Sequence, residues 1–164
     1  MARWRTTHGS EMPSPTVIYI DADACPVKDE AARVAERHGL TIHFVSNAWM
    51  RLPEGLLISR VVVPEGPDAA DDWIVERAGK GDIVVSADIP LGARCLKSGA
   101  RVIGPTGKPF TDDGIGMALA MRDFSRHLRE TGESKGYNAG FTRQDRSRFL
   151  QALEEAVQSI KRGL

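Results

Sequence analysis

Six aspartates lie in three short clusters, each beside an apolar run or at the start of a helical stretch. They are Asp21, Asp23, Asp68, Asp71, Asp72 and Asp88. Carboxylates are hard oxygen ligands, which favour Mg²⁺ or Mn²⁺ among the metal ions that proteins bind. One or two such ions activate water as a nucleophile and stabilise the leaving oxygen of a phosphodiester. The chemistry that these residues suit best is therefore metal-assisted hydrolysis or transfer of a phosphoryl group.

Short apolar runs that alternate with helical stretches provide the elements that must position these acids. We expect strands at residues 17–20, 41–45, 60–63, 82–86 and 101–103. We expect helices from Pro26 to Gly39, at 68–78 and at 90–97, with an irregular 46–59 segment that could hold a short helix. Unbroken apolar strands between helices are typical of a parallel sheet covered on both faces. The pattern predicts a three-layer, doubly wound α/β fold whose mainly parallel five-stranded sheet has the order 3-2-1-4-5.

This topology would bring the acidic clusters together. Every cluster lies past the carboxyl end of a predicted strand, at the edge where parallel α/β sheets bind their ligands. In the order 3-2-1-4-5 the first and fourth strands are neighbours, so Asp21 and Asp88 would face each other across the crevice. Carboxylates held in one pocket repel one another unless a cation lies among them. The clusters together therefore predict a cation site at this edge.

Each acid also has a structural explanation. Asp68 could cap the helix that follows it, with Asp71 as its capping-box partner. Asp23 could cap the first helix, and Asp88 could begin a turn before Ile-Pro. These roles leave open why all three clusters lie at one edge. Asp21 fits them least, since a carboxylate directly after a buried strand is costly without a partner.

Beyond the fifth strand the pattern becomes helical, at 114–129 and again from about Thr142, with a polar link at 130–140. Apolar residues recur at helical spacing on one face of the last helix: Phe149, Leu150, Leu153, Val157 and Ile160. We expect this stripe to pack into the core, with a contact between two copies of the chain as the alternative. Residues 1–15 have no periodicity and are expected to form a flexible leader before a single domain at 16–164, with Met12 as an alternative start.

Composition and charge exclude several classes of protein. Lys and Arg total 22, as do Asp and Glu, so the chain is no simple polycation. No apolar run approaches the ~20 residues that a membrane-spanning helix needs. Cys25 and Cys95 have no CxxC spacing, which excludes a disulfide scaffold or a usual zinc site and fits the cytoplasm. Cys25 has no His nearby in the sequence, so we expect it to pack rather than to act as a nucleophile.

RNA is the partner that the local charges favour. Acids outnumber bases at 64–91, whereas bases outnumber acids at 122–148, so a basic flank could hold a phosphate backbone beside the metal. Asn47 and Arg51, which follow the second strand together with Trp49, could bond to a base or stack on it. The candidate substrate-binding residues are Asn47, Arg51, Ser86 and Arg122.

Three motifs resemble a known family. The segments VIYIDADACPVK at 17–28, DAADDWIVER at 68–77 and VVSADIPL at 84–91 resemble the bacterial YaiI/YqxD family. The resemblance spans about residues 16–124 and follows the family's motif order. That family is similar to the PIN-like nucleases, in which acidic residues at the strand ends hold Mg²⁺ or Mn²⁺ and cut RNA. The resemblance therefore implies a PIN-like fold and the same chemistry.

The resemblance also implies roles for individual acids. By motif, the first PIN acid falls on Asp21, the helix acid on Asp71 or its neighbour Asp72, and the later aspartate on Asp88. We therefore expect Asp21, Asp71 and Asp88 to be the catalytic metal ligands. The further candidate ligands in the same motifs are Asp23, Asp72 and Asp68. The family usually carries a Gly-Gly-Pro-rich segment before the last helix, where this chain has SKGYNAGF at 134–141.

Two rival functions remain open. A strand followed by Asp-x-Asp also fits a haloacid-dehalogenase-type phosphatase, with Asp21 as nucleophile, Asp23 as acid/base and Ser86 as a second hydroxyl. Against it, the paired acids at 71–72 precede Ser86, whereas that family places them after it. A non-catalytic RNA-binding or adaptor protein could keep the same fold with a vestigial acidic pocket. We favour a metal-dependent RNA nuclease of the PIN-like type, in which water activated by the metal attacks the phosphodiester.

Overall fold

A computed structural model describes residues 15–64, 66, 68–111 and 141–163. The described chain contains a parallel sheet of five strands in the order β3-β2-β1-β4-β5, which confirms the predicted topology. The strands are β1 (Val17–Asp21), β2 (Thr41–Ser46), β3 (Ile58–Val62), β4 (Ile83–Val85) and β5 (Arg101–Ile103). The third strand begins two residues earlier than predicted, because its parallel pairing with β2 starts at Ile58, opposite Ile42.

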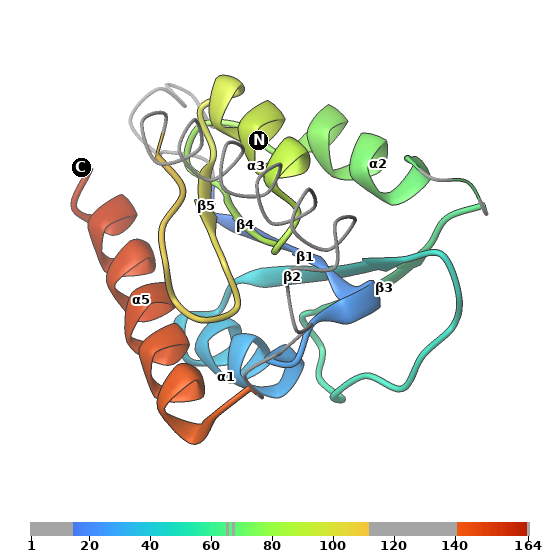
Figure 1. Ribbon diagram of the computed structural model, residues 1–164. Helices are drawn as coiled ribbons and strands as arrows, with labels where there is room; N and C mark the ends of the chain where they lie inside the picture. The colour runs from blue at the N-terminus through green and yellow to red at the C-terminus, as the bar shows by residue number, and fades with distance from the viewer. Residues whose placement is uncertain (1–14, 65, 67, 112–140, 164) are drawn as a thin grey trace, which may run out of the picture.

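Helices cover both faces of the sheet, as Figure 1 shows, with α1 and α5 on one side and α2 and α3 on the other. They are α1 (Lys28–His38), α2 (Ala69–Arg77), α3 (Ile89–Lys97) and α5 (Arg143–Lys161), and a short 3₁₀ helix, η2 (Ala22–Ala24), follows β1. Two predictions were wrong in detail. The first helix begins at Lys28 rather than near Pro26, and residues 47–57 form no helix. The predicted helix at 114–129 and residues 1–14 of the predicted leader lie outside the described residues.

The core has two parts, one on each face of the sheet. On the α1 and α5 side, Ile20 and Phe44 of the sheet pack with Phe149 and Leu153 of α5. The predicted stripe of α5 is therefore confirmed as core, since all its members are buried in this cluster or pack against it. On the other side the cluster is formed by Tyr19, Val45, Val84, Val102, Ile74 and Leu91 with their neighbours. Burial on both faces explains why the central strands β1 and β4 are unbroken apolar runs.

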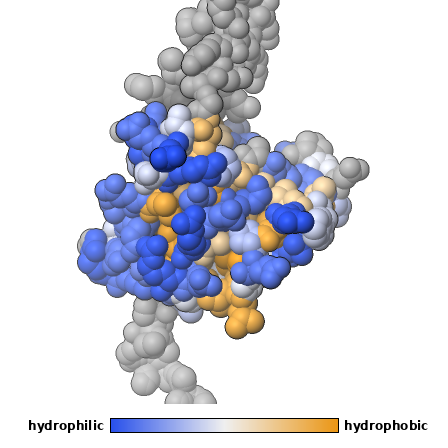
Figure 2. Space-filling view, turned by 90° about the horizontal axis from the view of Figure 1, so that it is seen from below, coloured by the Kyte–Doolittle hydropathy of each residue, from blue (hydrophilic) through white to orange (hydrophobic). Residues whose placement is uncertain are grey.

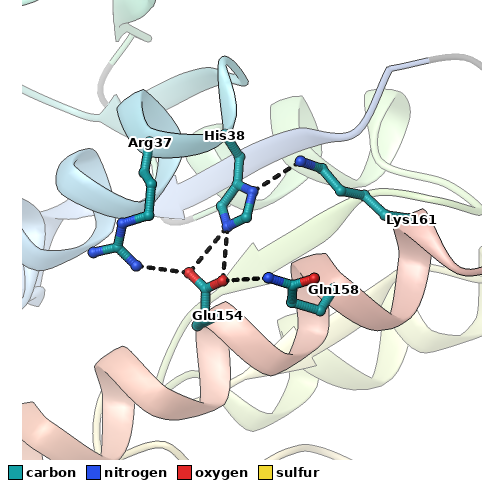
Figure 3. Close-up of polar contacts among 5 residues, drawn as sticks. All are labelled: Arg37, His38, Glu154, Gln158 and Lys161. Atoms are coloured by element: carbon teal, nitrogen blue, oxygen red, sulfur yellow. Dashed lines mark hydrogen bonds and ion pairs between the residues drawn. The ribbon is translucent and has the colours of Figure 1, made fainter.

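A polar cluster also joins α1 to α5, and Figure 3 shows it in detail. Glu154 accepts hydrogen bonds from Arg37 at 2.8 Å, from Gln158 at 2.7 Å and from Nε2 of His38 at 2.9 and 3.0 Å. Lys161 lies 2.8 Å from Nδ1 of His38. Because an ammonium group only donates, His38 accepts with Nδ1 and donates from Nε2. The ring thus links the two helices that cover one face of the sheet.

The molecular surface on this side is mostly hydrophilic, with smaller hydrophobic patches, as Figure 2 shows from below. No helix among the described residues is long and apolar enough to cross a membrane.

Candidate functional site

Asp21, Ser86 and Asp88 come together where β1 and β4 end. The register pairs Ile20 with Val85, so the next residues, Asp21 and Ser86, lie at the same edge. The Ser86 hydroxyl donates to Oδ2 of Asp21 at 2.8 Å and accepts from the Asp88 backbone N–H at 2.9 Å. Ser86 is only 2% exposed, so its hydroxyl depends on these two partners. One buried hydroxyl therefore joins the β1 carboxylate to the start of α3.

A cavity of about 370 Å³ opens at this point. It is lined by Asp21, Cys25, Val85, Ser86, Ala87, Asp88, Ile89 and Pro105. The two carboxylates lie where neighbouring strands lead away in opposite directions, which is where open α/β sheets bind ligands. The predicted proximity of the acids that follow the first and fourth strands is thus seen in the structure.

Asp88 has a structural role as well. It is the N-cap of α3, and its Oδ1 accepts from the Leu91 backbone N–H at 2.9 Å, with Pro90 in the first turn. The alternative that Asp88 serves the local backbone is therefore correct, although it caps a helix rather than a simple turn. The other carboxylate oxygen makes no hydrogen bond with the described residues. The cap fixes Asp88 at the rim of the cavity and leaves one oxygen available.

The two neighbouring acids of α2 have different surroundings. Asp72 forms an ion pair with Arg94 of α3 at 3.0 Å. Burial raises the pKa of Asp71 to about 6, and the charges of Asp88 and Asp21 add to this rise. Asp71 therefore shares the electric field of the cavity, although it does not line the cavity wall. Asp71 is therefore the helix acid whose charge interacts with those of Asp21 and Asp88, whereas Asp72 forms an exposed ion pair with α3.

Asp21 is also affected by its neighbours. Burial raises its pKa, the hydrogen bond from Ser86 opposes that rise, and the charges of Asp88 and Asp23 reinforce it. Carboxylates that disfavour one another's charge are the donor set that a hard divalent cation would stabilise. Asp21, Asp71 and Asp88 thus fit Mg²⁺ or Mn²⁺ in ligand type and in charge. Among the described residues, however, no group of three or more His, Cys, Asp or Glu is placed to hold a metal ion, so binding would require side chains to reorient.

The capping roles expected for Asp68 and Asp23 were wrong. Asp68 occupies the N-cap position of α2, but its backbone is not extended and its side chain makes no capping hydrogen bond. No side chain caps α1 either, because Asp23 lies in η2, upstream of the helix start. Asp23 instead accepts from the Asn47 backbone N–H at 3.3 and 3.4 Å. It therefore ties the end of β1 to the segment that follows β2.

The predicted substrate-binding residues are not all at one place. Asn47 donates from its side chain to the Pro64 carbonyl at 3.2 Å, which links the segments after β2 and β3. Arg51 is exposed and lines a second cavity beside the first. Arg122 lies outside the described residues, as does most of the predicted basic flank. The described bases of that flank include Arg146, which pairs with Glu30 of α1 at 3.2 Å.

Sequence reasoning missed two bases that line the second cavity, Lys28 and Arg60. The sequence holds a signal for both: Lys28 ends the first acidic motif, and Arg60 is a basic residue within a mostly apolar run at 56–63. Cys25 lines both cavities and is buried, and this burial raises the pKa of its thiol. The expectation that Cys25 packs is confirmed, because its side chain is buried in the core cluster on the α1 and α5 side of the sheet.

The fold and the site define a class: a doubly wound α/β protein with paired carboxylates in a cavity at the switch point of its sheet. Within that class, the family model described as "Uncharacterized BCR, YaiI/YqxD family" matches residues 19–159, and the chain belongs to this family. The expected family is thereby confirmed.

Bacterial relatives agree with this placement. A UPF0178 protein of Parvibaculum lavamentivorans is 64% identical over 147 residues, covering 90% of this chain and 97% of the relative. A UPF0178 protein of Rhodospirillum rubrum is 61% identical over 147 residues, covering 89% and 98%. One from Rhizobium meliloti is 58% identical over 146 residues, covering 89% and 100%. These names state no activity, so the comparisons show the family alone.

Proposed function

We propose that this protein is a divalent-metal-dependent nuclease that hydrolyses RNA phosphodiesters at the cavity formed by Asp21, Ser86 and Asp88. The observation that carries the proposal is that two carboxylates, those of Asp21 and Asp88, line one cavity at the switch point of the sheet, where the buried Ser86 hydroxyl bonds to the Asp21 carboxylate and to the Asp88 backbone N–H. The coupling of Asp71 to both carboxylates supports it, because three mutually repelling acids suit a bound cation. The similarity of the family to PIN-like nucleases points to the same chemistry.

In this proposal each residue has a stated part. Asp21, Asp71 and Asp88 would hold Mg²⁺ or Mn²⁺, which supplies Lewis acidity at the phosphodiester. Ser86 orients Asp21 by donating to Oδ2 and leaves its other oxygen for the cation. The ion pair of Asp72 with Arg94 links the helix that carries Asp71 to α3.

The partner and the compartment belong to the same proposal. RNA is the proposed substrate, and the cytoplasm is the proposed compartment, since Cys25 and Cys95 are both free and buried. Any homo-oligomer formed through α5 would have to use the polar face of this helix, because its apolar stripe is occupied by the core.

The experiment that tests the proposal compares Mn²⁺ binding and RNA cleavage in the wild type and in Asp21→Asn. Calorimetric titration measures the metal, and a labelled single-stranded RNA measures cleavage. We expect the wild type to bind Mn²⁺ and to cleave, and Asp21→Asn to lose both. Glu36→Gln, which neutralises an exposed acid of α1, is the matched control and should retain both activities. Cleavage that persists in Asp21→Asn or in EDTA would refute the proposal.

The RNA-binding adaptor is a second candidate, which the lack of a preformed three-ligand group among the described side chains favours. This candidate would be supported if the wild-type protein binds RNA, does not bind Mn²⁺ and does not cleave the RNA. The phosphatase alternative has less support, because Asp23 is exposed, contacts Asn47 and does not line the cavity beside Asp21. The acid/base group that this mechanism needs next to its nucleophile is therefore absent from the cavity lining.

A further inference from the structure

A second, larger cavity adjoins the acidic one. It is a groove of about 1180 Å³ between the start of α1 and the segment that joins β2 to β3, which arches beyond the sheet in Figure 1. Cys25 lines both cavities, so the groove begins where the acidic cavity ends. Any chain-like ligand with a phosphate at the acidic cavity would therefore have a path into this groove.

The groove contains an exposed tryptophan. Trp49 is 67% exposed, and the guanidinium of Arg60 lies 4.8 Å from the centre of its ring. Arg60 also donates to the Met50 carbonyl at 3.3 Å, which holds the guanidinium beside the ring. In contrast, Trp73 packs against Tyr19 in the core. Trp49 is therefore a supported aromatic surface that leaves most of its ring open to a ligand.

Cations from three parts of the chain line the same groove. Lys28 donates to the Cys25 carbonyl at 2.7 Å, at the junction with the acidic cavity. Arg51 and Arg60 come from the segment after β2 and from β3. None of the three forms an ion pair with a carboxylate among the described residues, so their charges remain available for an anionic ligand. Two acids, Asp29 and Glu54, also line the groove, which leaves it with one net positive charge.

We propose that the groove binds the unpaired nucleotides next to the phosphate in the acidic cavity, with one base stacked on Trp49 and the backbone following Lys28, Arg51 and Arg60. Aromatic surfaces combined with cations are the means by which proteins bind single strands, since an unpaired base exposes its flat face. A duplex would keep its bases stacked on each other and away from the ring. This inference rests on the proposed function and identifies where its substrate lies.

The test measures RNA binding without cleavage. A labelled pentauridylate is titrated in EDTA and followed by fluorescence anisotropy, and a pentamer of base-free ribose phosphates is used as competitor. The variants are Trp49→Ala, Trp49→Phe and Arg51→Ala, with Arg162→Ala as a matched control at an exposed arginine near the end of the chain. Thermal unfolding of each variant checks that it is folded.

We expect Trp49→Ala to weaken pentauridylate binding roughly 5- to 100-fold, as for loss of one base stack. Trp49→Phe should retain most of the affinity, because phenylalanine can still stack. The base-free pentamer should bind the wild type and Trp49→Ala equally weakly. Arg51→Ala should lower the affinity for pentauridylate. It should also reduce the slope of log affinity against log salt concentration by about the amount that one phosphate contact contributes, while Arg162→Ala should change neither quantity.

Three results would overturn the inference: no binding by the wild type, unchanged binding by Trp49→Ala, or an equal loss for both pentamers in that variant. The proposed nuclease fails separately. If pentauridylate binds through Trp49 but Mn²⁺ produces no cleavage, the groove stands and the nuclease does not. If cleavage depends on Asp21 while Trp49→Ala binds pentauridylate like the wild type, the nuclease proposal stands and the groove proposal fails.

Discussion

Neutralising Asp71 should make the metal-free protein more stable, which is the opposite of what most substitutions of a helical residue do. The side chain of Asp71 makes no hydrogen bond or ion pair with the other described residues, and its pKa is raised from 3.8 to about 6. The folded state thus binds the proton more tightly than the unfolded state does. Removing the charge with Asp71→Asn removes an unfavourable interaction with burial and with the carboxylates of Asp21 and Asp88.

The magnitude follows from the size of the shift. A rise of about two pKa units corresponds to about 3 kcal/mol at ~1.4 kcal/mol per unit. Because Asp71 is partly exposed, solvent screening reduces this figure, and we expect about 1 kcal/mol. For a chain of this size such a gain raises the melting temperature by roughly 2–4 °C.

The sign depends on pH. Near pH 4 the Asp71 carboxyl is protonated in the folded state and about half protonated in the unfolded state, so Asp71→Asn and the wild type should differ little in stability. Between pH 3.8 and about 6 the unfolded wild type releases this proton while the folded wild type retains it, so the variant becomes the more stable protein. The difference should level off just above pH 6, where the folded carboxyl is ionised as well.

Thermal unfolding in EDTA between pH 4 and pH 8 measures this difference, and Asp72→Asn is the matched control. Asp72 is one residue away but forms an ion pair with Arg94, so its neutralisation should give no gain. Adding Mn²⁺ should stabilise the wild type more than Asp71→Asn, since a ligand stabilises the state that binds it. The reasoning is refuted if Asp71→Asn gains nothing at pH 8, or gains as much at pH 4.

Two further substitutions test the contacts that hold the site and its supporting layer. Ser86→Ala should lower the free energy of unfolding by about 2 kcal/mol in urea denaturation, because it removes a buried hydrogen bond to the Asp21 carboxylate; a change below about 0.5 kcal/mol would show that this bond contributes little. His38→Ala should lower the free energy of unfolding by about 1–2 kcal/mol in the same assay, since the ring is largely buried where the end of α1 meets Glu154 of α5. Arg37→Ala, which removes an exposed partner of the same carboxylate, should cost less than about 1 kcal/mol, and an equal or greater loss would contradict this ranking.

The parallel sheet could be predicted because its central strands, β1 and β4, are buried on both faces. Val17–Asp21 contains three consecutive buried residues, and such a run fits only a strand enclosed by helices. The start of α1 could not be predicted as well. A 3₁₀ helix follows β1 directly, so Asp23 and Pro26 precede a helix that begins only at Lys28. Local preferences identified the helix, and the geometry of the chain leaving the sheet decided where it begins.

For the site, topology predicted the acids that would meet but not the contacts between them. The hydrogen bond between Ser86 and Asp21 joins residues 65 positions apart and depends on the register of β1 against β4. The choice between Asp71 and Asp72 depends on how α2 is rotated about its axis. Adjacent helical residues point about 100° apart, and the ion pair with Arg94 turns Asp72 toward α3. Neither the register nor the rotation can be read from a motif.

The aspartates at this edge of the sheet differ in whether a stabilising contact explains their presence. Asp88 caps α3, and Asp21 accepts a hydrogen bond from the Ser86 hydroxyl, so both carboxylates have partners within the fold, although burial still raises the pKa of Asp21. Asp72 forms an ion pair between two helices. Asp71 has no such contact with the described residues, and its charge opposes folding. Stability therefore does not explain why an acid stands at this position, whereas a functional role does. Strongly shifted pKa values of this kind are common at functional sites. Of the acids at this edge, Asp71 is therefore the one that gives the proposed cation site its strongest support.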